Sequence, residues 1–282
     1  MGGTGKTPTV LELAKFFQKK GLKVGILLRG YKRSSKGAKL VSKGVKPLLN
    51  VFEAGDEAYL YARLLKGVAV AVAEKRCEGW ELLKRLKPDI LLLDDAFQHL
   101  AIERDFDIVL LTPGDLKAKV FPFGRLREPL SSLKRANYCL ISKTEKSLEL
   151  ENLCKEFGKP FGYLKVVGFK LFKPNLEEVS FNTLRSKKVG IVSALGDNKG
   201  FQRQMEKLAK LYNFSIEKVL EFPDHYHYRG LNLDPNLIWL TTFKDIFKIP
   251  AAGLKIYAID RKVELPENLL NLLKELLLKR NS

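Results

Sequence analysis

The sequence has few residues of the kinds that build metal and disulfide sites, since only three of its 282 residues are cysteine and three are histidine. The cysteines are Cys77, Cys139 and Cys154, and they form neither a Cys-x-x-Cys pair nor a Cys/His ligand spacing. This pattern excludes a disulfide-rich secreted domain and argues against a zinc or redox site. We expect all three to be buried small hydrophobic residues in a reducing cytoplasm.

The sequence also has no long apolar run. The longest runs, such as 67–73 and 90–93, are as short as single strands, whereas a helix that spans a membrane needs about 20 residues. The chain starts with a glycine-rich motif where a secretory signal would stand, so we expect no signal peptide. Hydrophobic residues make up 45% of the chain, as in globular proteins, and the length predicts two domains.

Acidic residues are scarce beside basic ones, because 32 Asp and Glu against 50 Lys and Arg give a formal charge of +18. A positive field of this size favours a polyanion, which could be a nucleic acid, an anionic membrane surface or a phosphorylated substrate. A lysine-rich solvated surface explains the same excess. The aromatic residues are not interleaved with the basic runs, so we expect no nucleic-acid partner.

The most informative stretch is 1–8, with the sequence MGGTGKTP. Its glycines let backbone N–H groups surround a polyphosphate, its lysine adds charge at the β- and γ-phosphates, and its threonine hydroxyl can bind Mg²⁺. The full motif begins one residue before Met1, so we expect its first glycine and the strand that feeds it to lie outside this sequence. The residues expected to bind a nucleotide are Gly2, Gly3, Thr4, Gly5, Lys6 and Thr7.

Short apolar strands alternate with helices through the first half of the chain, which predicts an α/β fold with a P-loop NTPase-type parallel sheet flanked by helices. A loop or short hairpin is expected at 32–46. The expected strands are 23–28, 68–73, 89–93, 107–111 and 138–142, and the expected helices are 10–20, 55–65, 77–86, 129–135 and 148–157.

A second, smaller α/β unit is expected after an extended connection at 162–181. Its strands are predicted at 189–192, 219–222, 237–242 and 255–259, and its helices at 201–211 and 267–279. This pattern predicts a nucleotide-binding kinase domain at 1–161, an extended linker at 162–188 and a smaller C-terminal α/β domain at 189–282.

Acidic residues follow an apolar strand at Asp94 and Asp95. P-loop proteins hold Mg²⁺ at such a strand end, opposite the threonine of the loop. The sequence therefore predicts a metal site formed by Thr7, Asp94 and Asp95. In the alternative interpretation, one of the two aspartates caps the next turn.

A second acidic pair, Asp56 and Glu57, opens a predicted helix at the same edge of the sheet. An aspartate close to a hydroxyl group can orient it and accept its proton. The alternative is that Asp56 caps the helix and Glu57 complements the helix dipole.

Two of the three histidines, His225 and His227, lie in the segment 222–228. A zinc site built from this segment lacks ligands, so a pairing of histidine with an aspartate is favoured. Two arginines, Arg125 and Arg127, precede the predicted helix at 129–135 and could clamp a phosphate. They could equally be solvated loop residues.

Six segments, in this order along the chain, resemble the tetraacyldisaccharide 4′-kinase family, the lipid A 4′-kinases of Gram-negative bacteria. The six segments are GGTGKTP at 2–8, RGY at 29–31, GDE at 55–57, DDAFQH at 94–99, LREP at 126–129 and FPDH at 222–225. A seventh segment, 242–245, departs from the family pattern, because it reads Thr-Phe-Lys-Asp where the family has Thr-Glu-Lys-Asp.

The resemblance implies transfer of the γ-phosphate of ATP, with Mg²⁺, to the 4′-hydroxyl of a tetraacyl glucosamine disaccharide 1-phosphate, an anionic glycolipid. By motif matching, Lys6 and Arg127 would contact phosphates. Asp94 and Asp95 would serve the metal and the active site. Asp56 would be the catalytic base, and His225 would pair with it.

The resemblance also implies a cytoplasmic enzyme that is peripheral at the inner membrane, and we expect a monomer. The family's N-terminal membrane-associating helix is not in this sequence, so membrane binding is expected to rest on basic and amphipathic surface. One alternative remains from the motif alone, because partitioning-type ATPases also carry a glycine-rich GKT loop near the N-terminus. Such a nucleotide switch would use its positive face to bind a polyanion.

Overall fold

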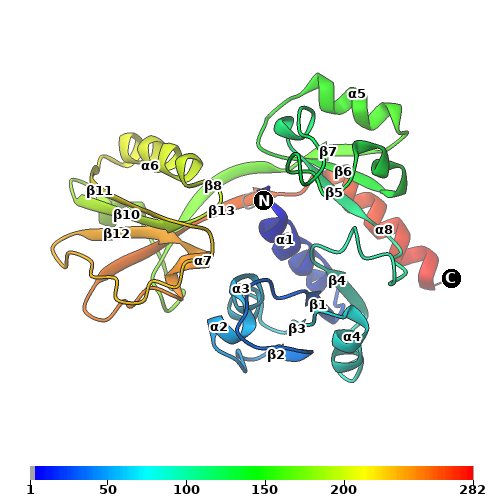
Figure 1. Ribbon diagram of the computed structural model, residues 1–282, viewed down its shortest axis with the longest axis horizontal. Coiled ribbons are helices and arrows are strands. Elements are labelled where there is room, and N and C mark those ends of the chain that lie inside the picture. Colours follow the sequence, from blue (N-terminus) through cyan, green and yellow to red (C-terminus); the bar gives the residue numbers. More distant parts are fainter. Residues whose placement is uncertain (1–3, 282) are drawn as a thin grey trace.

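Three sheets organise residues 4–281, the part of the chain that the computed structural model describes (Figure 1). The first sheet has the order β2-β3-β1-β4, and only its edge strand β2 is antiparallel. Its central strands are apolar and buried along their whole length, as expected when helices cover both faces. Its strands are β1 (Val24–Leu28), β2 (Lys39–Lys43), β3 (Ala69–Val72) and β4 (Ile90–Leu93), with helices α1 (Lys6–Lys19), α2 (Val51–Ala54), α3 (Asp56–Leu64) and α4 (Arg76–Lys84).

The second sheet, β5-β6-β7, is parallel and short. One apolar cluster joins it to helix α5, and Leu150 and Cys154 of that helix are fully buried there. Its elements are β5 (Ile108–Leu111), β6 (Tyr138–Ile141), β7 (Phe161–Tyr163), α5 (Leu148–Glu156) and the 3₁₀ helices η1 (Pro113–Asp115) and η2 (Leu130–Arg135).

The third sheet has six strands in the order β11-β10-β12-β13-β8-β9. Helix α6 covers one face through Phe201, Met205 and Leu208, whose spacing of four and three residues places them on one side of the helix. Its elements are β8 (Lys165–Phe172), β9 (Glu178–Val179), η3 (Phe181–Leu184), β10 (Lys188–Ala194), α6 (Asn198–Tyr212), β11 (Ser215–Phe222), β12 (Ile238–Thr242), α7 (Phe243–Ile246) and β13 (Lys255–Glu264).

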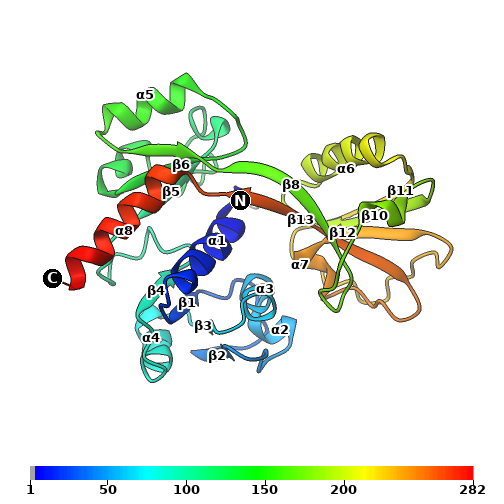
Figure 2. The ribbon, with the colours of Figure 1, turned by 180° about the vertical axis from the view of Figure 1, so that it is seen from behind.

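Two antiparallel strands of this sheet, β8 and β13, extend from it toward the rest of the molecule and connect the two (Figures 1 and 2). After β13 the chain continues into α8 (Glu267–Asn281), which lies beside the second sheet. Leu269 and Leu273 of α8 join a core cluster that also contains residues of α1, β1 and β6. A separate cluster packs Leu60 of α3 against Phe243 and Ile246 of α7, so the part of the chain with the six-stranded sheet also contacts a helix that packs on the first sheet.

A cavity of about 1120 Å³ lies where the first and second sheets approach one another. It is lined by β4, β5, α1 and α8, and β4 and β5 do not pair with each other. Most of its wall is apolar, but one end carries the charged side chains of Lys6, Asp94, Asp95 and Arg127. The carboxyl ends of the parallel strands thus meet the start of α1 at the polar end, where ligand sites form in α/β proteins.

The structure confirms the predicted fold class and nearly all the predicted elements, with four differences. The parallel strands of the first half form two sheets and not one. The segment 32–46 contains an edge strand, β2, and 162–181 contains β8, which is part of the six-stranded sheet. Helix 129–135 is a 3₁₀ helix. Cys139 and Cys154 are buried as expected, but the expectation for Cys77 was wrong because it is exposed.

The division into segments 1–161, 162–188 and 189–282 stays a prediction. Strand β8 of the linker segment pairs with strand β13 of the C-terminal segment. Helix α8 of the C-terminal segment packs into the core of the first segment. Among the described helices, none is long and apolar enough to cross a membrane.

Candidate active site

The loop that leads into α1 turns at Gly5, whose φ of +95° is strained for any residue with a side chain. A Cβ at this position would also lie 2.8 Å from Leu164 Cδ2. Ser142, directly after β6, donates a hydrogen bond of 2.7 Å from Oγ to the carbonyl oxygen of Thr4 and fixes the loop. Among residues 4–281, no side chain caps the start of α1, so the first backbone N–H groups of this helix can bind an anion.

Lys6 and Arg127 meet at one carboxylate at the polar end of the cavity. Lys6 Nζ lies 2.9 Å from Asp95 Oδ1, and Arg127 Nη1 lies 2.7 Å from Asp95 Oδ2. Burial raises the pKa of Asp95, but the charges of Lys6 and Arg127 outweigh burial and hold it below its ordinary value. The structure therefore brings together two of the predicted phosphate ligands and one predicted metal ligand. Gly2 and Gly3 lie outside the described residues.

Asp94 points away from that ion pair and accepts a hydrogen bond of 2.8 Å from the Tyr61 hydroxyl at Oδ2. The hydrogen bond thus connects Asp94, a predicted metal ligand, to helix α3. Burial raises the pKa of Asp94 to about 6, although Tyr61 and the charge of Lys6 oppose the rise. In the absence of a cation, this carboxyl group is thus costly to ionise.

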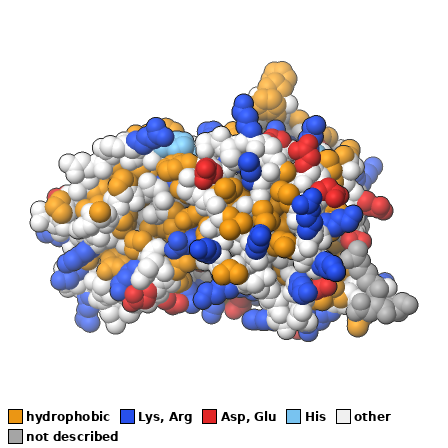
Figure 3. Space-filling view, turned by 90° about the horizontal axis from the view of Figure 1, so that it is seen from below, with side chains coloured by type: hydrophobic (Ala, Val, Ile, Leu, Met, Phe, Trp, Pro, Cys, Tyr) orange, Lys and Arg blue, Asp and Glu red, His pale blue; other side chains and the backbone are white. Residues whose placement is uncertain are grey.

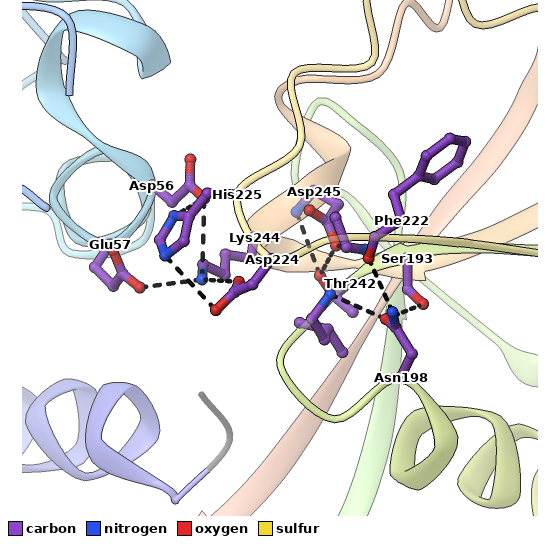
Figure 4. Close-up of polar contacts among 12 residues, drawn as sticks. Asp56, Glu57, Ser193, Asn198, Phe222, Asp224, His225, Thr242, Lys244 and Asp245 are labelled. Carbon is purple, nitrogen blue, oxygen red and sulfur yellow. Dashed lines mark hydrogen bonds and ion pairs between the residues drawn. The ribbon is translucent and has the colours of Figure 1, made fainter. Parts of the chain in front are cut away.

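Asp56 begins helix α3 but does not cap it, since the N-cap is Gly55 and no side chain makes a capping hydrogen bond. Asp56 Oδ2 instead lies 3.0 Å from His225 Nδ1, a contact that joins residues 169 positions apart (Figure 4). The capping interpretation was therefore wrong, and the predicted pairing of histidine with aspartate is present. The other oxygen of Asp56, Oδ1, accepts no hydrogen bond or ion pair from residues 4–281.

The backbone around His225 is held in an uncommon conformation. His225 has a φ of +68°, in the left-handed region, where residues other than glycine are rare and often functional. Asn198, at the start of α6, donates 2.9 Å from Nδ2 to the carbonyl oxygen of Phe222, three residues earlier. The ring of Tyr31 meets the imidazole edge to face at 5.4 Å. These contacts hold the imidazole opposite Asp56.

Two lysines that the sequence had not singled out complete this cluster. Lys248 Nζ lies 3.0 Å from Asp56 Oδ2 and 3.1 Å from Asp245 Oδ1, with only 2% of its side chain exposed. Lys244 Nζ lies 3.1 Å from Asp224 Oδ1, 3.3 Å from Glu57 Oε1 and 4.0 Å from Asp56 Oδ2 (Figure 4). Lys244 and Asp245 belong to segment 242–245, so the resemblance contained a signal for them, but Lys248 lies outside every motif.

The charges around Asp56 favour its ionised form. Burial raises the pKa of Asp56, but the hydrogen bond with His225 and the charges of Lys248 and Lys244 outweigh burial and lower it. For Lys244, burial lowers the pKa, and the carboxylates of Glu57, Asp224 and Asp56 raise it above its ordinary value. The cluster thus holds an anionic carboxylate with one uncommitted oxygen, which is the form that can accept a proton.

Glu57 connects the two charged clusters. It pairs with Lys244 in the Asp56 cluster, and its charge also raises the pKa of Asp94 at the cavity. Asp56 and Tyr61 lie five residues apart on α3, a rise of about 7.5 Å along the helix. A ligand that spans this short distance can contact both clusters.

The residues present fit a magnesium nucleotide. The N-terminus of α1, Lys6 and Arg127 offer donors and positive charge for phosphate, and Asp95 shows that both cations reach one anionic group. No group of three or more His, Cys, Asp or Glu residues within 4–281 is arranged to hold a metal ion. Proteins usually hold Mg²⁺ with one or two carboxylates together with the phosphates of the substrate.

A candidate phosphate site at one cluster and a candidate proton acceptor at the other are the two parts that transfer of a phosphoryl group to a hydroxyl requires. Together with the parallel α/β fold, they define a P-loop kinase. More specifically, the chain belongs to the tetraacyldisaccharide-1-P 4′-kinase (LpxK) family, whose sequence model matches residues 1–278.

Relatives of this chain agree with that assignment. The tetraacyldisaccharide 4′-kinase of Aquifex aeolicus is 37% identical over 273 residues, which cover 94% of this chain and 81% of the relative. The enzyme of the same name from Chlorobaculum parvum is 37% identical over 266 residues, covering 88% and 72%. A crystal structure of Aquifex aeolicus LpxK in complex with ATP has a TM-score of 0.80 and 36% identity, covering 98% of this chain and 85% of that one.

Proposed function

We propose that this chain transfers the γ-phosphoryl group of ATP to the 4′-hydroxyl of a tetraacyl glucosamine disaccharide 1-phosphate, a step of lipid A biosynthesis. The observation that supports the proposal most is the Asp56–His225 contact, because it belongs to a cluster that favours the ionised form of Asp56, the form that can accept a proton. The names of the relatives supply the acceptor. The family match favours a kinase over the nucleotide switch that the loop alone left open.

Each charged residue has a role in this reaction. The backbone of Thr4 and Gly5 contacts the phosphates, and Lys6 and Arg127 neutralise their charge. Thr7, Asp94 and Asp95 would hold Mg²⁺ together with the phosphates. When bound, the magnesium nucleotide supplies the phosphoryl group and lowers the charge that repels an attacking oxygen.

Asp56 acts on the acceptor. Its Oδ2 is held by His225 and Lys248, so Oδ1 can accept a hydrogen bond from the 4′-hydroxyl and orient its oxygen toward the γ-phosphate. The proton of the hydroxyl passes to Oδ1 as the new oxygen–phosphorus bond forms, the bond between the γ-phosphorus and the bridging oxygen breaks, and ADP leaves. A carboxylate with a lowered pKa is a weak base, and this suits a loose transition state in which the proton leaves late.

The acceptor is a lipid, so we propose that the chain is a cytoplasmic protein that binds peripherally at the inner membrane of a Gram-negative bacterium and acts as a monomer. Its excess of 18 positive charges favours an anionic surface. Binding to vesicles of anionic lipid should weaken steeply with salt, since exposed charges are screened within about 8–10 Å at physiological ionic strength. Binding that does not respond to salt would point to an apolar anchor alone.

An assay with radiolabelled ATP tests the proposed reaction. The protein is incubated with [γ-³²P]ATP, Mg²⁺ and the disaccharide 1-phosphate in detergent, and a labelled bisphosphorylated lipid is expected. Asp56→Ala serves as the matched control, because it removes the proton acceptor and leaves the phosphate cluster in place. Absence of product would refute the proposal, whereas ATP-dependent dimerisation or DNA binding without product would favour the switch.

A further inference from the structure

Two phenylalanine side chains stand exposed in the loop between η1 and η2. Phe121 is 74% exposed and Phe123 is 85% exposed. Neither ring belongs to a hydrophobic cluster formed by the described residues. We call residues 117–127 the aromatic finger. Soluble proteins seldom present large apolar side chains together in this way unless they bind something apolar.

The backbone of the aromatic finger is closed by its own hydrogen bonds. Phe121 N donates to Leu126 O at 2.7 Å, Leu126 N donates to Lys119 O at 3.1 Å, and Phe123 N donates to Val120 O at 3.0 Å. A Cβ at Gly124 would collide with the backbone of Lys119, so the turn is tight at its tip. The rings are therefore presented by an ordered turn, and little conformational entropy remains to be lost when they bind.

The base of the aromatic finger is fixed to the second sheet. Arg125 Nη2 lies 3.1 Å from Asp115 Oδ1 and donates to Thr112 Oγ1 at 3.2 Å. Asp115 Oδ2 in turn accepts hydrogen bonds from the backbone N–H and the hydroxyl of Thr112, each at 2.7 Å. The charge of Arg125 is used in this anchor.

Two positive charges of the aromatic finger are not used in the fold. Lys117 and Lys119 are exposed, and neither forms an ion pair with any residue from 4 to 281. Residues 116–127 include no acidic residue. The tip thus combines two apolar rings with two free ammonium groups, a combination that fits the boundary between acyl chains and anionic headgroups.

We propose that the aromatic finger is a membrane-contact element that inserts Phe121 and Phe123 among the headgroups of an anionic bilayer while Lys117 and Lys119 bind lipid phosphates. This proposal specifies which residues make the peripheral membrane contact proposed above. It rests on the proposed function, because a glycolipid acceptor would bring the site close to a membrane.

Area and charge favour a lipid surface over a protein partner. A phenylalanine buries about 150–250 Å², so two rings offer about 300–500 Å². A stable protein interface needs about 800 Å² on each side, whereas reversible membrane binding combines a small apolar area with electrostatic attraction. Figure 3 shows one face of the molecule, where Lys and Arg side chains lie around apolar ones and Asp and Glu are sparser.

The aromatic finger also ends in the candidate site. Arg127, which pairs with Asp95, follows Phe123 by four residues. Four residues span at most about 14 Å, so rings seated in the headgroup layer keep the phosphate cluster close to the bilayer surface. A glycolipid could then reach Asp56 with its acyl chains still in the membrane.

Co-sedimentation with vesicles tests the proposal without ATP or acceptor. The vesicles contain phosphatidylethanolamine with phosphatidylglycerol, and the partition coefficient is measured for each variant. Phe121→Ser/Phe123→Ser should lower it about a hundredfold, which corresponds to about tenfold per ring. The matched control is Leu211→Ser on α6, a side chain that is 70% exposed, and it should leave partitioning unchanged. Lys117→Gln/Lys119→Gln should weaken binding to these vesicles but not to pure phosphatidylcholine.

Depth is a second readout that a fluorophore supplies. A polarity-sensitive dye is attached through Phe123→Cys in a Cys77→Ser background, since the other two cysteines are buried. Vesicles should shift its emission to the blue, and a dye attached through Leu211→Cys should not shift. Equal partitioning of the phenylalanine variant and the control, or no shift at residue 123, would overturn the proposal.

Two other outcomes distinguish the membrane contact from a dimer interface and from the proposed kinase reaction. If sedimentation velocity shows a dimer that the phenylalanine substitutions dissociate, the aromatic finger is an interface between copies of the chain and the proposal is wrong. The partition coefficient does not depend on turnover, so a failed kinase assay with normal vesicle binding would refute the proposed reaction and not the membrane contact.

Discussion

Lys248 Nζ lies 3.0 Å from Asp56 Oδ2, although the two residues are 192 positions apart. Asp56 begins helix α3, and Lys248 lies in the turn after helix α7. The ammonium group is almost fully buried and is shared with Asp245, which is itself fully buried and accepts a hydrogen bond of 3.1 Å from the backbone N–H of Ala194. The six-stranded sheet thus holds one oxygen of Asp56 through a buried charge. The geometry assigns Lys248 as a positioning residue for the proposed base.

Replacing Lys248 with methionine tests this role. Lys248→Met keeps the length of the side chain but removes the charge, so Asp56 loses its orientation and Asp245 is left buried without its counterion. We expect kcat to fall about a hundredfold, as when positioning is lost, with KM for ATP changed less than about twofold. Stability should fall by about 3–5 kcal/mol, the cost of breaking a buried ion pair. Steady-state kinetics and urea denaturation measure the two effects.

A compensated variant separates positioning from folding. Lys248→Met/Asp245→Asn removes both members of the buried pair, so most of the lost stability should return. Its kcat should stay low, because Asp56 still lacks the ammonium group. Recovery of kcat together with stability would show that Lys248 acts only on folding.

The Asp56–His225 contact predicts strong coupling between the two side chains. Asp56→Ala and His225→Ala should each lower kcat by about 10²–10⁴-fold, the range for loss of acid–base assistance. The double variant should be little worse than either single variant, because residues that act as one unit give non-additive losses. Losses that multiply in a double-mutant cycle would show that the two residues act independently.

The predicted elements that proved correct are those with strong local signals. Strands β1, β3 and β4 are short apolar runs that need no information about partners. The separation of β4 from β5 and the pairing of β8 with β13 depend on contacts between distant residues, which a local pattern does not contain. Helix propensity likewise did not distinguish the 3₁₀ turn at η2 from an α-helix.

The candidate site was predictable to the extent that its residues lie in motifs. Lys6, Asp95 and Arg127 come together as the motifs imply, and so do Asp56 and His225. Lys248 was not found, since a single lysine in a chain with 50 basic residues carries no local signal. Its proposed role follows from its burial against the carboxylates of Asp56 and Asp245. That arrangement forms only when α7 and the turn after it pack against α3.

Lys6 should matter for nucleotide binding and hardly at all for folding. Its ion pair with Asp95 is about one-third exposed on each side, and such pairs contribute only about 0–1 kcal/mol. Lys6→Ala should therefore keep the melting temperature of the free protein. ATP with Mg²⁺ should stabilise the wild type by about 2.7 kcal/mol at a hundred times Kd, and this gain should be lost in the variant. Thermal shift assays with and without nucleotide measure both, and an equal ATP response would contradict the assignment of Lys6.

Asp260 lies on strand β13 of the six-stranded sheet. We expect its carboxyl group to make the stability of the protein depend on pH. Burial raises its pKa from 3.8 to about 6, and the hydrogen bond from Arg261 N and the charges of Lys15 and Lys170 oppose the rise only in part, while Glu12 adds to it. The folded state therefore binds more protons than the unfolded state between these two values, so this carboxyl group makes stability fall as pH rises through that window.

Asp260→Asn removes this titration and keeps the shape of the side chain. The full shift corresponds to about 3 kcal/mol, and because Asp260 is only half-buried, solvent screening reduces the expected effect to about 1–2 kcal/mol. The variant should be more stable than the wild type by this amount at pH 8 and equal to it below pH about 3, where the Asp260 carboxyl group is protonated in both the folded and the unfolded state. Urea denaturation across this range measures the difference between the two proteins, in which the titration of other groups such as Asp94 cancels. A difference that is constant with pH would show that Asp260 is already ionised without cost in the folded protein.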